Sequence, residues 1–229
     1  MQLAAITLTH PRVRLEPFAE RCRAGLTAAA ADPTIWRHIP FAVVEHGYGA
    51  WFNWLMAEQA TGHWLPFAVI AFAPPFTGEL SSAQRETEGG AASSPHRLAT
   101  LATSPASGGG KIVGQSCYIN PRPKDACVEI GGTWYAPEAQ GTAINPAAKL
   151  LLLGHAFDSS AERVEFKTDA RNARSRAAME KLGCAFEGVF RRHMRRPDGS
   201  WRDTAWYAII REEWPGVKAR LEARLEAFD

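Results

Sequence analysis

The chain has 229 residues, of which 46% are hydrophobic and 22% charged, and its formal net charge is +2 at pH 7. A chain of this length can bury one substantial core and shows no internal repeat, so we expect one domain spanning residues 1–229. The small net charge indicates no partner by itself. The amino-terminal segment lacks the pattern of a signal peptide, and the apolar run 67–76 is too short and proline-broken to span a bilayer. We therefore expect a cytoplasmic protein without a membrane partner.

Hydrophobic periodicity and turn residues predict strands and helices that alternate along the chain. The expected strands are residues 12–16, 64–72, 111–119, 128–135, 163–168, 186–195 and 201–210. The expected helices are residues 19–31, 48–60, 146–157, 173–182 and 212–228. The last two strands should form a hairpin, because Pro197, Asp198 and Gly199 between them are strong turn residues.

One segment departs in composition from the rest of the chain. Residues 73–110 are dominated by Ala, Gly, Ser, Thr and Pro and interrupt what would otherwise be a short turn between two strands. This composition predicts a flexible surface insertion. The four cysteines and seven histidines show no metal-ligand spacing, so we expect reduced thiols and no metal.

Residues 128–153 predict a strand, a short loop and a helix whose first turn is open to an anion. Asn145 followed by Pro146 is typical of a helix start, because Asn caps the helix and Pro lacks an N–H that would have no partner there. The preceding residues 140–144 bring free amides to the positive end of the helix dipole, where phosphate groups bind. The loop matches neither a P-loop nor a dinucleotide fingerprint, and an ordinary strand–loop–helix unit explains it about as well.

A second helix start follows the strand 163–168. Asn172 is expected to cap this helix and Gly183 to end it. One face at helical spacing is expected to pack and consists of Ser175, Ala178, Met179 and Leu182. The remaining faces carry the basic residues Arg171, Arg174, Arg176 and Lys181, which could meet phosphate.

These two helix starts resemble the GNAT superfamily of acetyl-CoA-dependent N-acetyltransferases, in the branch of the ribosomal-protein N-terminal acetyltransferases. The family's pyrophosphate loop, Arg/Gln-x-x-Gly-x-Gly/Ala, falls on residues 140–145, where Ala143 and Asn145 depart from the small residues of the pattern. The second signature, an Asn with a Gly eleven residues on and a nearby aromatic residue, matches Asn172, Gly183 and Phe186. The resemblance implies an α/β fold with a mixed, mostly antiparallel central sheet flanked by helices, splayed fourth and fifth strands, and a C-terminal hairpin.

The resemblance also implies acetyl transfer from acetyl-CoA, as cosubstrate, to the primary amine of a small molecule or a protein N-terminus. In the family, the fourth strand bulges, and its exposed amides bind pantetheine. Gly131 and Gly132 suit such a bulge, although a weak spot in an ordinary strand is the alternative. The residues expected to bind the cosubstrate are Thr133, Trp134, Tyr135, Gln140, Gly141, Thr142, Ala143, Ile144, Asn145, Asn172, Ser175 and Arg176.

Two residues are candidates for the chemistry of transfer. Glu129 stands in the register in which some histone acetyltransferases keep their general base, and a partly buried carboxylate there could take the amine proton through water. A solvated carboxylate or an anchor for the substrate ammonium explains Glu129 almost as well. The usual general-acid position is Met179, which cannot donate a proton. Ser175 could instead hydrogen-bond the CoA sulfur, or it only packs and the thiolate leaves unaided.

Other features leave alternatives open. Aromatic residues of the early helical region could form an acceptor pocket or belong to the core, and they are Trp36, Tyr48, Trp51, Phe52 and Trp54. The basic run 191–196 is expected to be a solvated hairpin arm or an electrostatic guide rather than a nucleic-acid patch. A homodimer is compatible with the resemblance. The alternative to an enzyme is a non-catalytic acyl-CoA-binding module, which Met179 favours.

Overall fold

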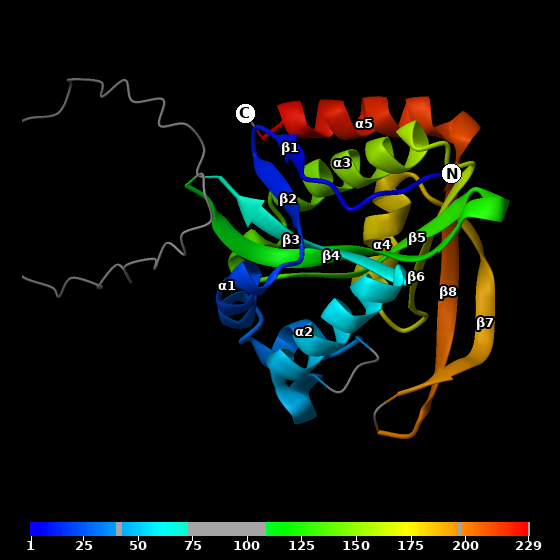
Figure 1. Cartoon of the computed structure of the whole chain (residues 1–229). Coiled ribbons are helices and arrows are strands. Elements are labelled where there is room, and N and C mark those ends of the chain that lie inside the picture. The colour runs from blue at the N-terminus through cyan, green and yellow to red at the C-terminus, as the bar shows by residue number, and fades with distance from the viewer. Residues whose placement is uncertain (40–42, 73–108, 197, 229) are drawn as a thin grey trace, which may run out of the picture.

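The computed structural model describes residues 1–39, 43–72, 109–196 and 198–228, which form one eight-stranded sheet with helices on both faces (Figure 1). The strands are β1 (Leu8–His10), β2 (Val13–Pro17), β3 (Trp64–Ala71), β4 (Lys111–Arg122), β5 (Cys127–Tyr135), β6 (Arg163–Asp169), β7 (Ala185–Arg195) and β8 (Trp201–Ile210). The helices are α1 (Arg23–Ala29), α2 (Val43–Thr61), α3 (Ile144–Asp158), α4 (Ala173–Leu182) and α5 (Trp214–Glu226).

Most expected elements are present, with three differences. A short first strand, β1, was not predicted, so the expected fourth and fifth strands are β5 and β6. Helix α2 begins five residues before the expected 48–60 and is broken at Gly47, whose φ is 75°. Short 3-10 turns take the place of the first residues of the expected helices 19–31 and 212–228.

The sheet order is β1-β2-β3-β4-β5-β6-β8-β7. Every neighbouring pair is antiparallel except β5 and β6, which are parallel. These two strands pair over three residues of each, from Cys127 to Glu129 in β5 and from Arg163 to Glu165 in β6, and no further register follows. The predicted mixed sheet, its splayed central strands and its C-terminal hairpin are therefore confirmed.

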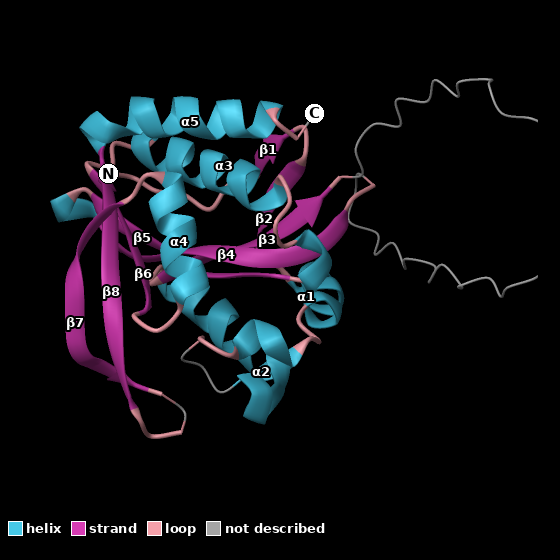
Figure 2. Cartoon of the chain, turned by 180° about the vertical axis from the view of Figure 1, so that it is seen from behind, coloured by secondary structure: helices cyan, strands magenta, loops and turns pink. Residues whose placement is uncertain are grey.

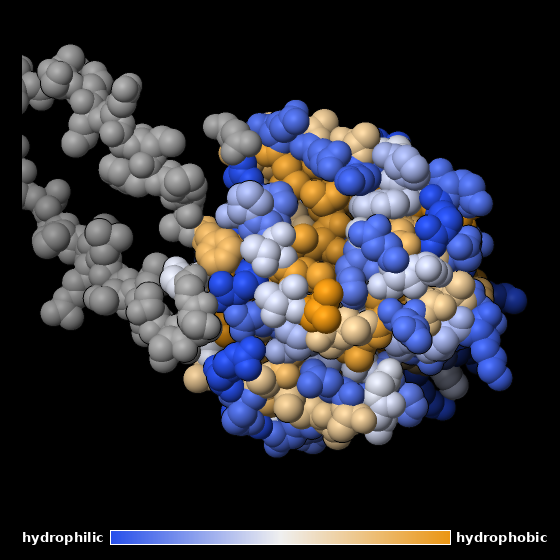
Figure 3. All heavy atoms as spheres, turned by 45° about the horizontal axis from the view of Figure 1, so that its top comes forward, coloured by the Kyte–Doolittle hydropathy of each residue, from blue (hydrophilic) through white to orange (hydrophobic). Residues whose placement is uncertain are grey.

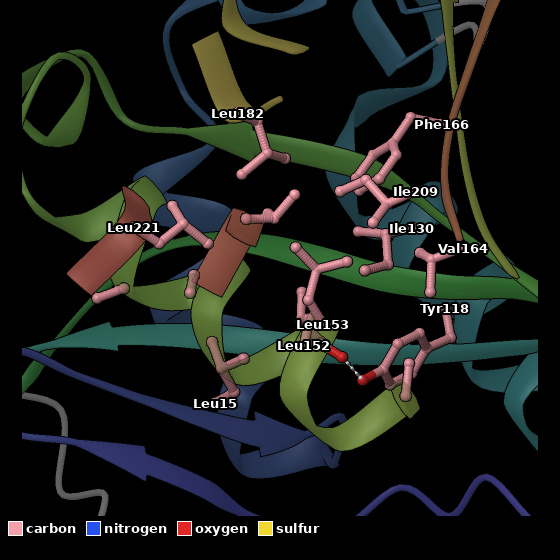
Figure 4. Close-up of a cluster of buried hydrophobic side chains, with 14 of the residues drawn as sticks. Leu15, Tyr118, Ile130, Leu152, Leu153, Val164, Phe166, Leu182, Ile209 and Leu221 are labelled. Atoms are coloured by element: carbon pink, nitrogen blue, oxygen red, sulfur yellow. Dashed lines mark hydrogen bonds between the residues drawn. The ribbon is translucent and has the colours of Figure 1, made fainter. Parts of the chain in front are cut away.

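Two apolar cores flank the sheet. Helices α3 and α5 cover one face, and α1 and α2 cover the other (Figures 1 and 2). On the first face, Leu152 and Leu153 of α3 are fully buried, and the Tyr118 hydroxyl donates to the Leu152 carbonyl at 2.5 Å (Figure 4). Small residues, Ala147 and Ala148, let the start of α3 approach the sheet closely. The position of the amino end of α3 is thus fixed by packing.

The amino-terminal residues Met1, Leu3, Ala5 and Leu8 pack against the α3–α5 core and are partly buried. With the top of Figure 1 turned forward, hydrophobic residues are visible as a band between hydrophilic ones (Figure 3).

None of the described helices is long and apolar enough to cross a membrane. The predicted insertion 73–110 lies outside the described residues except for its last two.

Candidate active site

The centre of the site is a bulge in β5. Gln115 of β4 pairs with Trp134 of β5. Cys117, two residues further along β4, pairs with Gly131, three residues back along β5, so β5 carries one extra residue. Gly132 within this interval has a φ of 56°, and its carbonyl accepts a hydrogen bond from Gln115 Nε2 at 3.0 Å. The predicted glycine bulge is confirmed.

Next to the bulge, β5 is no longer paired with β6. Residues 130–135 have no β6 partner, because the pairing of the two strands ends at Glu129 and Glu165. An unpaired strand edge presents backbone N–H and C=O groups that an extended ligand with its own amides can pair with. The splay therefore offers a backbone docking edge at the middle of the sheet.

The loop that leads from β5 to α3 lies at the end of this edge. Gly141 has a φ of 78°, and apart from its chain neighbours no atom of the described residues lies within 4 Å of the position that a Cβ would occupy. Among the described residues, the backbone amides of Gly141, Thr142, Ala143 and Asn145 donate to no protein acceptor. Free amides at the positive end of a helix are suited to a phosphate group.

The predicted cap of α3 is wrong. The helix begins at Ile144 with Ala143 as its N-cap, so Asn145 lies inside the first turn. The Thr142 hydroxyl accepts from the Ile144 amide at 3.3 Å and satisfies a first-turn donor in place of Asn145. Pro146 still falls in the first turn, where its missing N–H costs nothing.

The predicted cosubstrate residues around the loop use their side chains to hold the backbone in place. The Trp134 ring is buried against the rings of Trp36 and Tyr48, each with centroids 5.4 Å away. Gln140 Nε2 donates to the carbonyl of buried Tyr135 at 2.8 Å. These side chains anchor the strand and the loop, so a ligand would meet their backbone.

A buried lysine lies beneath the bulge and was not predicted. Lys149 Nζ of α3 donates to Thr133 Oγ1 at 3.0 Å and to Ser116 Oγ at 3.4 Å. Burial lowers the pKa of Lys149 to about 8. The signal in the sequence was its helical spacing, because Lys149 shares one face with Leu152 and Leu153 three and four residues later.

Helix α4 begins and ends as predicted. The Asn172 side chain accepts from the Ser175 amide at 3.1 Å, and Gly183 ends the helix with a φ of 94°. Ser175 is half-buried. The expected packing face is wrong at Ala178, which is exposed because α4 meets the molecule mainly through Leu182 and Met179.

The remaining predicted cosubstrate residue, Arg176, is engaged by the C-terminal hairpin. Its Nε donates to the Tyr207 hydroxyl at 3.0 Å, and its guanidinium lies 5.5 Å from the centroid of the Phe186 ring. Contact of Arg176 with a cosubstrate stays a prediction.

Glu129 lies where the two strands begin to separate. Its neighbours Val128 and Ile130 point into the α3–α5 core, whereas Glu129 Oε2 lies 2.6 Å from Lys167 Nζ on the opposite face. The Glu129 side chain is 9% exposed, which excludes the solvated carboxylate considered above. Burial raises the pKa of this carboxyl, and the Lys167 ammonium opposes the rise.

The early aromatic residues belong mostly to the α1–α2 core. Trp36, Tyr48, Trp51 and Phe52 are buried, whereas Trp54 is 38% exposed. The Tyr48 hydroxyl donates to Gln115 Oε1 at 2.7 Å. These contacts support the structural interpretation for the four buried rings, and Trp54 stacks on Trp51 with ring centroids 4.8 Å apart.

The basic run of the hairpin is divided among several partners. Arg196 Nη2 lies 2.6 Å from Asp169 Oδ2, and the Arg195 guanidinium lies 4.2 Å from the centroid of the Trp201 ring. An open hollow of about 710 Å³ is lined by Phe190, Arg191, Arg192 and His193.

Within the described part of the chain, no group of three or more His, Cys, Asp or Glu residues is arranged to hold a metal ion. The four cysteines are free and buried.

Comparison with known proteins gives consistent matches. A family model described as an acetyltransferase (GNAT) domain matches residues 12–185. A protein of T. thermophilus assigned as an acetyltransferase is 33% identical, with 98% of this chain and 100% of that chain covered and a TM-score of 0.73. Mycobacterium smegmatis RimJ, solved in complex with CoA-disulfide, is 25% identical, with coverages of 96% and 93% and a TM-score of 0.65. No curated protein sequence matches the chain.

The family match and the geometry agree on the same segments. The matched residues 12–185 span well over half of the chain and include the bulge, the loop before α3 and the start of α4. A GCN5-related N-acetyltransferase from Brucella melitensis, 24% identical over 97% of this chain and 86% of that chain, has the same fold with a TM-score of 0.73. The chain belongs to the GNAT acetyltransferase family.

Proposed function

We propose that this protein transfers the acetyl group of acetyl-CoA to a primary amine. The observation that carries the proposal is the continuity between the unpaired edge of β5, residues 130–135, and the free amides of Gly141, Thr142, Ala143 and Asn145 at the start of α3. Pantetheine has amides that can pair with a strand edge, and its pyrophosphate suits a helix amino end. One extended ligand can use both features at once.

The residues of the chain take separate parts in this reaction. The loop amides bind the pyrophosphate, and Gly141 leaves space for its approach. The edge of β5 beside Thr133 holds pantetheine and directs an amide at the acetyl oxygen, where charge develops during attack. Ser175, at the start of α4, remains a candidate donor to the sulfur. The bound thioester would then be fixed in line for the amine.

Glu129 is the proposed general base. It lies on the sheet face opposite α3, so an amine could approach the thioester from that side while the loop holds the pyrophosphate. Its buried carboxylate can take a proton from the acceptor ammonium, directly or through one water, so that the neutral amine attacks the thioester carbonyl. Burial raises the pKa of Glu129, and the Lys167 ammonium, 2.6 Å away, opposes this rise by favouring the ionised carboxylate.

The acceptor class is proposed from the resemblance. Similarity to RimJ over nearly the whole chain supports the branch of ribosomal-protein N-terminal acetyltransferases, in which the acceptor is a protein N-terminus. A small-molecule amine is the other acceptor of this class. We further propose one domain with a surface insertion and a cytoplasmic location.

Acetyl-CoA binding tests the proposal first. At a hundredfold excess over its dissociation constant, acetyl-CoA should stabilise the fold by about 2.7 kcal/mol, measured as a thermal shift and confirmed by calorimetry. Release of free thiol should then depend on an added amine or N-terminal peptide. Absence of both a thermal shift and a heat of binding would refute the proposal.

A non-catalytic acyl-CoA-binding module is the second candidate. Met179 favours it, because this side chain packs against the core at the position where a proton donor is expected. Such a module would bind acetyl-CoA with the same thermal shift. It would release no thiol with any member of a broad panel of amines and N-terminal peptides.

A further inference from the structure

Arg202 of β8 is a buried cation without a partner. The residue is 6% exposed, and its Nε is buried without a hydrogen-bond acceptor. Within the described ranges of the chain, its guanidinium makes neither a hydrogen bond nor an ion pair. Burial lowers the pKa of Arg202, and a buried unpaired charge is costly unless a bound anion satisfies it.

The nearby carboxylates are already occupied by other cations. Asp169 Oδ2 accepts from Arg196 at 3.0 and 2.6 Å, and Asp169 Oδ1 accepts from the Arg171 amide at 2.9 Å. Glu129 Oε2 is held by Lys167 at 2.6 Å. Two carboxylates therefore face four cations, Lys167, Arg171, Arg196 and Arg202, of which the first three form ion pairs with them. Arg202 is the cation that pairs with neither carboxylate. Its guanidinium can bind a carboxylate or a phosphate through two parallel N–H donors.

Arg202 lies on the same sheet face as Glu129. Trp206 pairs with Lys167 across β6 and β8, and Arg202 follows on the same face because alternate residues of a strand point the same way. Four residues separate Arg202 from Trp206, which is about 13 Å along a strand. Burial raises the pKa of Glu129, and the positive charge of Arg202 is among the charges that oppose this rise, so the two groups interact electrostatically.

This face is opposite to α3, whose amino end we assign to the pyrophosphate. Tyr207 and Ile209 lie on the other face of β8 from Arg202 and Trp206, and their side chains point into the α3–α5 core. The Arg202 face instead borders the hollow over residues 190–193, because His193 Nδ1 lies 3.1 Å from Thr204 Oγ1 and the Phe190 ring lies 4.8 Å from the Trp206 ring. A ligand of Arg202 would therefore come from the acceptor side.

We infer that the acceptor carries an anionic group, a carboxylate or a phosphate, that binds the Arg202 guanidinium while its amine is placed at Glu129. The inference rests on the proposed acetyl transfer. It narrows the acceptor to amines that also bear an anionic group.

Matched pairs of acceptors test the inference. Each pair differs only in the anion, and the pairs are alanyl-aspartate amide against alanyl-asparagine amide, β-alanine against β-alaninamide, and phosphoethanolamine against ethanolamine. In the parent protein, kcat/KM for thiol release should be about 10- to 100-fold higher for the anionic member of at least one pair, as expected for charge-assisted hydrogen bonds. The pair with the largest ratio identifies a peptide side-chain carboxylate, a free carboxylate or a phosphate as the source of the anion.

Substitution of Arg202 separates recognition from folding. Arg202→Gln should raise KM for the preferred anionic acceptor and remove the preference, while the neutral member of the pair keeps its rate. Arg202→Lys keeps the positive charge but lacks the two parallel donors of the guanidinium. It should therefore recover part of the preference that Arg202→Gln loses. Arg195→Gln, at an exposed residue of the same hairpin, is the matched control and should preserve the preference.

Three outcomes would overturn the inference. One is equal kcat/KM within every pair for the parent protein. Another is an Arg202→Gln variant that loses activity equally with both members of the preferred pair, which indicates a structural role. The third is weaker acetyl-CoA binding in this variant, which would assign Arg202 to the cosubstrate. If Arg202→Gln does not fold, a second experiment uses the parent protein. Succinate or inorganic phosphate should then inhibit thiol release competitively with respect to the acceptor. If neither anion inhibits, the inference is wrong. In each case, the acetyl-CoA thermal shift and thiol release with neutral amines test the proposed function separately.

Discussion

The two sides of the splay between β5 and β6 are built from different parts of the chain. On the α3 side, the proposed ligand contacts are the backbone amides of Gly141, Thr142, Ala143 and Asn145 and the unpaired edge 130–135. On the opposite side, the groups that face an acceptor are charged side chains, Glu129, Lys167 and Arg202. The proposed cosubstrate side thus uses backbone groups, whereas the proposed acceptor side depends on the identity of its side chains.

The largest effect should come from Glu129 on the acceptor side. Glu129→Gln should lower kcat by about 10² to 10⁴-fold with nearly unchanged acetyl-CoA affinity, because a general base acts in the transition state. Burial raises the pKa of Glu129, so the parent rate should rise with pH through a value above the usual carboxyl range. The variant should lose that rise and recover part of its rate at high pH, where the amine is already neutral. A pH profile of thiol release measures both effects.

Glu165→Gln is the matched control for this variant. Glu165 pairs with Glu129 in the parallel register and is equally buried, but its carboxylate is held by Arg122 at 2.9 Å and Arg163 at 3.0 Å. This substitution should cost stability and keep the rise of the rate with pH, moved toward lower pH because the Glu165 charge helps to raise the pKa of Glu129. If Glu129→Gln turned over like the parent at every pH, Glu129 would have no part in the chemistry.

A change in the loop should affect the α3 side alone. Gly141→Val should weaken acetyl-CoA binding by about 10- to 100-fold, since a branched side chain crowds the path to the loop amides and one or two charge-assisted hydrogen bonds are lost. The acceptor KM should change little. Gly62→Val is the control, because Gly62 has a φ of 76° and equally open surroundings far along the chain from the loop. Equal weakening of acetyl-CoA binding by both variants would show that strain, and not phosphate contact, is the cause.

The bulge joins the two sides, and Gly132 should be sensitive to a single methyl group. A Cβ there would lie 3.0 Å from the Trp64 ring and 3.2 Å from Cys117 Sγ, and the φ of 56° disfavours any other residue. Gly132→Ala should lower the free energy of unfolding by about 2 kcal/mol, of which the backbone accounts for at least half. Denaturation of this variant beside Gly62→Ala, where the new methyl group meets nothing within 4 Å, isolates the packing part.

Lys149 is the exception to the comparison, because it is a buried charged side chain on the α3 side. Its pKa of about 8 lies below the ~10.4 of an unfolded lysine. Below pH 8 both states are protonated and the cost of burial is fully present, whereas between the two values the folded protein releases its proton first and the cost falls as pH rises. Lys149→Met should therefore raise the free energy of unfolding by about 1 kcal/mol at pH 7, after loss of its hydrogen bonds, and this gain should shrink above pH 8.

Thermal denaturation across pH measures this gain, with Cys117 and Cys184 as the other titratable groups that influence Lys149. Burial raises the pKa of Cys117 well above its usual range and that of Cys184 to about 12, so neither thiol ionises in the window. A lower kcat at unchanged acetyl-CoA affinity would show instead that the Lys149 ammonium takes part in acyl transfer.

Features that depend on neighbouring residues could be predicted from the sequence. The order of strands and helices follows from periodicity, the cap at Asn172 and the end at Gly183 from local backbone chemistry, and the bulge from two adjacent glycines that pair poorly. The placement of Glu129 opposite Val128 and Ile130 follows from strand alternation. Each of these is settled within about ten residues of chain.

Features that depend on distant residues emerged only in the folded chain. Packing of α3 on the sheet set its first turn, so that the N-cap is Ala143 instead of Asn145 and the Thr142 hydroxyl accepts from the Ile144 amide. Whether a charge is buried, paired or free is a sum over several strands, so the pairing of Glu129 with Lys167, 38 positions away, and the unpaired state of Arg202 had no local signal. The two kinds of feature differ because desolvation and Coulomb attraction act through space, whereas capping and periodicity act along the chain.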